Sequence, residues 1–184
     1  KKVEQLHFDI RKQLLAFDNV MNQQREAVYG ERHNILTDPS ILDHTWEILE
    51  GVVDDVINHY YPENGDPDPE RAEAKLKALF GPEVSSMIHG IDHQKDLQGP
   101  VENIRRDLHD KFYSKVREMG DQTANDLMRF IFLHTLDQNW KEHLLAMDDL
   151  RKGIGLRAVG QKDPLLEYQF ESYNLFQNMM ERVR

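Results

Sequence analysis

The chain has nine histidines and no cysteine, so histidine is the first residue type to consider as a metal ligand. Imidazole is a common metal ligand, and two histidines four residues apart lie on one face of a helix. His89 and His93 have that spacing, but the stretch lacks the glutamate of a zinc-protease helix and contains Gly90. Di-iron bundles need Glu-x-x-His on two helices, whereas Glu4 and His7 supply it once. We therefore expect no metal site, and elemental analysis would test the alternative of a metal-dependent helical-bundle enzyme.

The sequence also has no motif from which a catalytic nucleophile and its base could be proposed, and no phosphate-binding loop. Without cysteine there is no thiol nucleophile, disulfide or cysteine-based zinc site, and no Gly-x-Ser-x-Gly motif occurs. The stretch Gly160-Gln161-Lys162-Asp163 is typical of a turn and does not match the phosphate-binding consensus. His134 and His143 are interpreted as packing or surface residues. We expect no catalytic residue and no cofactor in this chain.

One short segment, residues 151–163, differs from the rest of the chain in charge. It carries a formal charge of +3 within a chain of net charge −10. The segment contains one acid, Asp163, against the cations Arg151, Lys152, Arg157 and Lys162. It also contains the aliphatic residues Ile154, Leu156 and Val159. Two interpretations stay open: a solvated turn whose cations follow a helix C-terminus, or a probe that presents charge and apolar groups to a partner.

The residues around this segment predict two helices folded back on each other, from Asp121 to Arg184. Apolar residues recur at steps of three and four, which places each set on one helix face. The first set is Leu127, Phe130, Leu133, Leu136, Trp140, Leu144, Met147, Leu150 and Ile154, and the second is Leu166, Phe170, Tyr173, Phe176, Met180 and Val183. Three glycines, Gly153, Gly155 and Gly160, are expected to break the first helix. Asp163 and Pro164 should start the second as N-cap and first helical residue.

The first 36 residues or so predict one long helix, because they contain no proline and carry a continuous apolar stripe. The stripe consists of Leu6, Ile10, Leu14, Phe17, Met21, Val28 and Ile35. At ~1.5 Å per residue such a helix spans roughly 50 Å, which suits a spine against which other bodies pack. Asp38-Pro39 should cap the next helix. Residues 38–119 then predict a small helical lobe, with a weak helix near 84–91 and a bend at Gly120.

Composition and charge narrow the possible functions. With 39% hydrophobic residues and no alternating strand pattern, the chain is expected to be all-α: a long scaffold helix, an antiparallel two-helix finger and a small inserted lobe. An acidic total argues against a nucleic-acid partner. No apolar run is long enough to span a membrane and no signal peptide is present, so cytosol is the default compartment. Because it begins at Lys1 without Met, we expect a fragment of a longer protein.

Two blocks of sequence resemble the SecA family, the motor ATPases of bacterial protein export. Residues 136–176, LDQNWKEHLLAMDDLRKGIGLRAVGQKDPLLEYQFESYNLF, closely resemble the two-helix finger of SecA. Residues 8–32, FDIRKQLLAFDNVMNQQREAVYGER, resemble the start of its helical scaffold. The resemblance implies a first scaffold helix at 1–37, a helical wing at 38–119 and a two-helix finger at 120–184.

The resemblance also implies a role. In SecA the scaffold helix contacts the nucleotide-binding domains and the preprotein cross-linking domain, and the finger reaches the mouth of the SecYEG channel beside the preprotein. Carried over, the fingertip that contacts channel and substrate consists of Arg157, Ala158, Val159, Gly160, Gln161 and Lys162. Trp140 and Arg151 fall in the hairpin that restrains ATP hydrolysis, and from pattern alone Trp140 would be a core residue. Many relatives have Tyr where Val159 stands, so an aromatic grip is not expected.

The family resemblance places the whole protein in the cytoplasm, peripherally associated with the inner face of the plasma membrane. ATP and Mg would belong to the parent protein, since the Walker motifs are absent from this chain. The fragment alone is therefore expected not to be an enzyme. The alternative is a stand-alone helical protein–protein docking module without catalytic activity.

Overall fold

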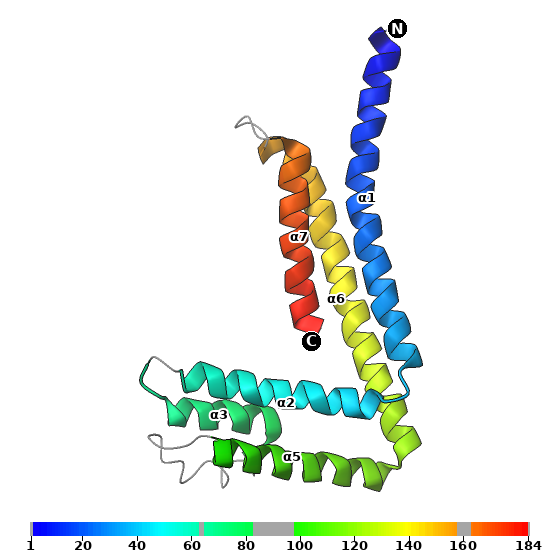
Figure 1. Ribbon diagram of the computed structural model, residues 1–184. Coiled ribbons are helices and arrows are strands. Elements are labelled where there is room, and N and C mark those ends of the chain that lie inside the picture. The colour runs from blue at the N-terminus through cyan, green and yellow to red at the C-terminus, as the bar shows by residue number, and fades with distance from the viewer. Residues whose placement is uncertain (1, 63–64, 83–97, 158–162, 184) are drawn as a thin grey trace. The chain divides into compact units, whose positions relative to one another are not determined.

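The computed structural model describes residues 2–62, 65–82, 98–157 and 163–183, and within these ranges every regular element is a helix (Figure 1). The all-α fold class predicted from the sequence is therefore confirmed. The helices are α1 (Lys2–Thr37), α2 (Ile41–Tyr60), α3 (Pro69–Phe80), α5 (Gln98–Met119), α6 (Asp121–Arg157) and α7 (Pro164–Val183). The weak helix expected near residues 84–91, with His89 and His93, lies outside the described residues.

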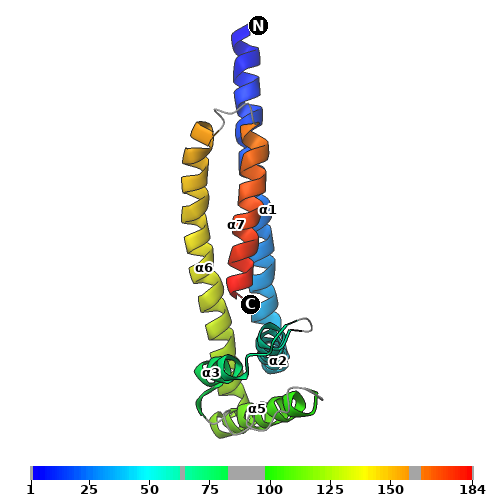
Figure 2. The same ribbon diagram turned by 90° about the vertical axis from the view of Figure 1, so that its left-hand side faces the viewer.

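The chain divides into two compact units. One contains residues 1–39 and 129–184, and the other contains residues 40–128. The first unit therefore joins α1 to most of α6 and to α7, which are distant in sequence. Within it α7 runs parallel to α1, and α6 runs antiparallel to both (Figures 1 and 2). The predicted single long helix and the antiparallel hairpin are both confirmed.

The prediction that glycine ends the first finger helix was wrong at two of the three positions. Helix α6 continues through Gly153 and Gly155 and ends at Arg157. A helical glycine costs only about 1 kcal/mol relative to alanine. Leu150 and Ile154 flank Gly153 and are both buried, in a cluster that also contains Tyr168. Their burial outweighs the glycine penalty, and it holds this part of the helix in place.

The apolar stripe predicted on α7 is buried only in its second half, where Phe176, Met180 and Val183 are half-buried. Leu166, Phe170 and Tyr173 are 63%, 64% and 60% exposed. The residues that α7 buries instead are Tyr168, Ser172 and Met179. Helix α7 therefore carries two stripes, and only one of them is fully buried. The buried stripe combines a large aromatic ring with a small serine, which lets α1 approach closely.

Two of the predicted helix boundaries are confirmed and one is not. The Asp163 carboxylate accepts a hydrogen bond from the Leu165 N–H at 2.9 Å, as an N-cap does at the start of α7. Gly120 has a φ of 84° and makes the turn from α5 into α6. In contrast, α2 begins at Ile41 with Ser40 in the N-cap position, so Asp38 does not cap it.

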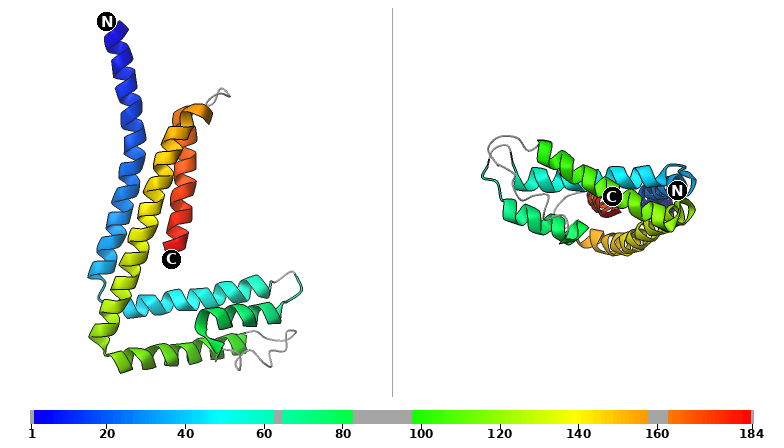
Figure 3. Two further views of the ribbon diagram at one scale, coloured as in Figure 1. Left: turned by 180° about the vertical axis from the view of Figure 1, so that it is seen from behind. Right: turned by 90° about the horizontal axis from the view of Figure 1, so that it is seen from below.

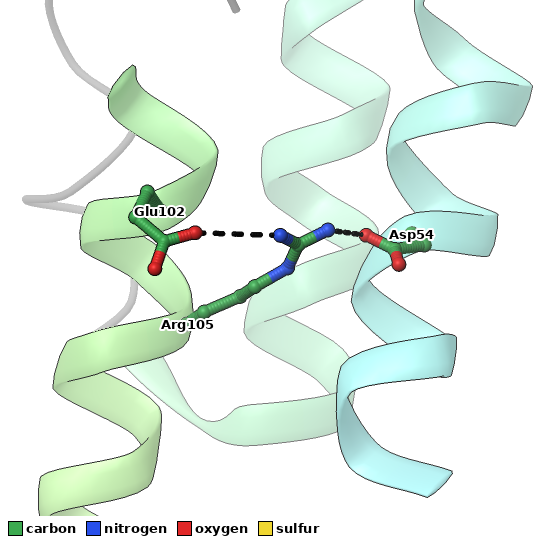
Figure 4. Close-up of polar contacts among 3 residues, drawn as sticks. All are labelled: Asp54, Glu102 and Arg105. Atoms are coloured by element: carbon green, nitrogen blue, oxygen red, sulfur yellow. Dashed lines mark hydrogen bonds and ion pairs between the residues drawn. The ribbon is translucent and has the colours of Figure 1, made fainter. Parts of the chain in front are cut away.

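The second unit packs α2, α3 and α5 around its own apolar core (Figure 3). The core contains Val53, Val56, Ile57, Tyr61, Ala72, Leu76, Val101, Ile104 and Leu108. At its edge Arg105 of α5 makes ion pairs with Asp54 of α2 and with Glu102 on its own helix (Figure 4). The side-chain hydrogen bond to Asp54 is the main cause that raises the pKa of Arg105. This unit thus has its own apolar core, with ion pairs at the edge of that core.

Candidate functional site

The end of the finger is anchored to the scaffold helix by a small apolar cluster. Its buried residues are Met147, Leu150 and Ile154 of α6 and Tyr168 of α7, and Phe17, Val20, Met21 and Leu175 pack against them. The rings of Phe17 and Tyr168 meet edge to face, with centroids 4.7 Å apart. Aromatic pairs in this geometry add about 0.5–1.5 kcal/mol beyond their burial. All three helices of the unit therefore meet just below the fingertip.

A buried chain of hydrogen bonds joins the same three helices. His143 of α6 is 2% exposed, Gln24 of α1 is 7% exposed and Ser172 of α7 is 0% exposed. The Gln24 amide nitrogen donates to the backbone carbonyl of Ser172 at 3.1 Å. The Gln24 oxygen lies 2.8 Å from Nε2 of His143. We call these three residues the Gln24 relay.

The relay requires a proton on Nε2 of His143, and burial keeps the ring neutral. Since the Gln24 nitrogen donates to Ser172, its oxygen is left as an acceptor, and His143 must donate from a protonated Nε2. Burial is the main cause that lowers the pKa of His143, to about 4, and the nearby positive charge of Arg182 adds to it. Arg182 itself pairs with Glu142, at 3.4 Å. His143 is therefore neutral at physiological pH, and both the tautomer and the charge suit the relay.

Trp140, expected from the pattern to be a core residue, is half-buried. Its ring stacks on His143 with centroids 5.5 Å apart, and His143 meets the Phe176 ring edge to face at 5.7 Å. Trp140 thus covers the relay histidine from one side. Its proposed part in regulating the motor is not tested by these contacts.

Ion pairs and a backbone contact tie α1 to α6 along the first unit. Arg151 pairs with Asp18 of α1 at 3.1 Å, and Arg32 pairs with Asp137. Further along α6, Arg129 donates to the backbone carbonyl of Asp38 at 2.7 Å. Exposed pairs of this kind contribute about 0–1 kcal/mol each. They align α1 with α6, while the buried contacts supply most of the stability.

Two of the four cations in residues 151–163 are paired with acidic side chains. Besides the pair that Arg151 makes with Asp18, Lys152 lies 2.5 Å from Asp148 and 3.8 Å from Asp149. Asp18, Asp148 and Asp149 lie outside residues 151–163, so they were not included in the charge of +3. The charges of Arg151 and Lys152 are therefore balanced by acids outside that segment. What remains in the segment is Arg157 and Lys162 against Asp163, a formal charge of +1.

The predicted fingertip can be located only in part. Arg157 is the last residue of α6, and its side chain is outside the described residues, as are Ala158, Val159, Gly160, Gln161 and Lys162. Across the described residues no group of three or more His, Asp or Glu side chains is placed to hold a metal ion. None of the helices described is long and apolar enough to cross a membrane.

The sequence pattern did not reveal the Gln24 relay. His143 had been interpreted as a packing or surface residue, and Gln24 and Ser172 are of types that usually face solvent. One signal could have found it: His143 lies between Trp140 and Met147 on the apolar stripe of α6. A polar residue on such a stripe must find a partner on a facing helix.

The family model for the SecA Wing and Scaffold domain matches residues 1–184 of the chain. The chain belongs to this family. It is 39% identical over 189 residues to the protein translocase subunit SecA of Syntrophus aciditrophicus and 38% identical over 193 residues to that of Pelotomaculum thermopropionicum. Another similar relative is the SecA subunit of Lawsonia intracellularis, at 39% identity over 185 residues.

Each of these matches covers the whole of this chain but only 22%, 21% and 21% of the respective relative. The chain thus spans about a fifth of the length of the SecA subunits that it resembles. The family resemblance inferred from residues 8–32 and 136–176 is confirmed and extends to the wing.

Proposed function

We propose that this chain is the scaffold, wing and finger part of a SecA protein translocase subunit and that it performs no chemistry of its own. In this role it couples an ATP-hydrolysing motor, located elsewhere in the parent protein, to the SecYEG channel and the preprotein. Its membership of the SecA Wing and Scaffold family supports the assignment. ATP and Mg would be bound by the parent's nucleotide-binding domains.

The observation that carries the proposal is the fixed connection between α1 and both helices of the finger. An apolar cluster, a buried relay and a row of ion pairs all join these helices. A unit held together in this way moves as one body, so a displacement imposed on α1 appears at the end of α6. Such a lever transmits motion without needing a catalytic group.

A different surface of the chain would contact each proposed partner. The fingertip, residues 157–162, would present the charges of Arg157 and Lys162 to acidic groups of the channel and small side chains to the preprotein. The exposed stripe of Leu166, Phe170 and Tyr173 on α7 suits an apolar contact with another part of the parent, such as the preprotein cross-linking domain. The protein would act in the cytoplasm, at the inner face of the plasma membrane.

Charge reversal at the fingertip tests the proposal. In the full-length subunit, Arg157→Glu with Lys162→Glu should reduce SecYEG-stimulated ATP hydrolysis and leave basal hydrolysis near normal. The control is Lys115→Glu with Arg117→Glu, the same charge change at two exposed positions of α5. Equal stimulation in the fingertip variant and the wild type would refute an electrostatic role for the tip.

The alternative, a docking module without a motor, has one observation in its favour. Next to the exposed stripe of α7 a groove of about 400 Å³ lies between α1 and α7, with Gln23, Gln169 and Gln177 in its wall. Binding of the purified chain to a protein other than SecYEG or SecA's own domains would favour this reading. Capture by SecA's nucleotide-binding domains would favour the coupling role.

A further inference from the structure

We infer that Gln24 is a positioning residue that sets the register of the two-helix finger on the scaffold helix. The inference rests on the proposed function in one respect, namely that the finger must move together with α1.

Both ends of the Gln24 amide and the Ser172 hydroxyl have hydrogen-bond partners. The Gln24 side chain uses its nitrogen toward Ser172 and its oxygen toward His143, and both contacts are of hydrogen-bond length. The Ser172 hydroxyl donates to the Gln169 carbonyl at 2.9 Å within α7. Because a buried polar group without a partner loses its hydrogen bonds to water and gains none in return, any shift of one helix that breaks the relay is opposed.

The relay has a direction that apolar contacts lack. The amide of Gln24 has one donating and one accepting end, and they point at different helices, α7 and α6. A slip of α6 by one helical turn, about 5.4 Å, would carry the His143 side chain out of reach of the Gln24 amide, whereas α7 offers a backbone carbonyl at every turn. The amide therefore specifies one register, as a buried asparagine does in a coiled coil.

The nearby apolar cluster alone would tolerate other registers. Its members include Met21 and Met147, whose flexible side chains adapt to altered neighbours. The outer face of α7 also carries Leu166, Phe170 and Tyr173, a second stripe that competes for burial. Apolar contacts therefore leave the position of the finger open, and the hydrogen bond from His143 to the Gln24 amide is the contact that fixes α6 on α1.

The test removes the relay without leaving a polar group unpaired. In Gln24→Met with His143→Leu both side chains become apolar at similar volume, and the Ser172 carbonyl keeps its own helical hydrogen bond. Since the chain has no cysteine, cysteines introduced at the exposed positions Asn19 of α1 and Lys141 of α6 provide two unique sites for spin labels. The distance between the labels reports the register of α6 on α1.

We expect the double variant to keep a urea midpoint near that of the wild type, while the distribution of label distances broadens or shifts, by at most about one helical turn, ~5.4 Å. The control is Glu142→Gln, which breaks the exposed α6–α7 pair with Arg182 beside the relay and should leave the distance unchanged. A double variant with the narrow wild-type distance would overturn the inference.

A second measurement needs no variant and so does not depend on the double substitution folding. Imidazole ¹⁵N shifts of the wild-type chain at neutral pH should show His143 as a single Nε2–H tautomer. An Nδ1–H tautomer would mean that His143 does not donate to Gln24, and the inference would be wrong. Neither result depends on fingertip charge reversal, so failure of the inference and failure of the proposed function can be told apart.

Discussion

Acidification should destabilise the first unit through one residue, His143. In the folded chain the pKa of His143 is lowered to about 4, mainly by burial. In the unfolded chain it should return to about 6.5. Between these values the unfolded state binds the proton and the folded state does not. Stability is therefore fully present above pH ~6.5 and falls as the pH drops from there toward 4.

The size of the effect follows from the two pKa values. The difference of about 2.5 units corresponds to about 3 kcal/mol when both transitions are complete. At pH 5 the folded state of His143 is still mostly neutral while the unfolded state is almost fully charged, and the loss is about 2 kcal/mol. This is a large share of the roughly 5–15 kcal/mol that stabilises a typical domain.

Urea unfolding from pH 8 to pH 4 measures this loss, and a variant isolates it from the carboxylates. His143→Gln cannot titrate but can still donate to Gln24, so its stability should fall less over the same range, by about 2 kcal/mol at pH 5. His134→Gln is the matched control, because His134 lies on the same helix and is exposed. If His143→Gln and the wild type lose stability in parallel, the buried, neutral state assigned to His143 is incorrect.

Three further predictions concern the packing inside each of the two units. Gly153→Ala should stabilise the chain by about 0.5–1 kcal/mol, since a Cβ there meets nothing within 4 Å, whereas Gly120→Ala should destabilise it by about 1–2 kcal/mol because its φ is 84°. Tyr168→Ala should cost ~3–5 kcal/mol and Trp140→Ala only about 1–2 kcal/mol, since Tyr168 is fully buried and Trp140 is not. Arg105→Ala should cost about 1 kcal/mol through loss of the pair with Asp54. Urea unfolding curves would measure all three, and a reversed order within either of the first two pairs would contradict the packing described.

Local signals in the sequence were sufficient to predict the helices. The Asp163-Pro164 start and the bend at Gly120 depend on backbone chemistry within one or two residues, and both were correct. The break expected at Gly153 and Gly155 failed because propensity is a small term beside the burial of Ile154 in a tertiary cluster. Local rules therefore predict helix existence better than helix ends.

Features that depend on contacts between distant segments could not be predicted. Two stripes of α7 have helical spacing, and only the position of α1 decides that Tyr168 is buried and Phe170 exposed. The partners in the Gln24 relay are 119 and 148 residues apart, so no local pattern reveals them. The fingertip roles of Arg157 and Lys162 came from the family resemblance, and they stay predictions.

Photo-crosslinking from the fingertip tests the coupling proposal most directly. A photoreactive amino acid at Val159 of the full-length subunit should crosslink to the SecYEG channel when ATP and preprotein are present. The same amino acid at the exposed wing position Glu118 should give much less of this product. A channel crosslink from Glu118 but none from Val159 would contradict the proposal that the finger is the part of this chain that reaches the channel.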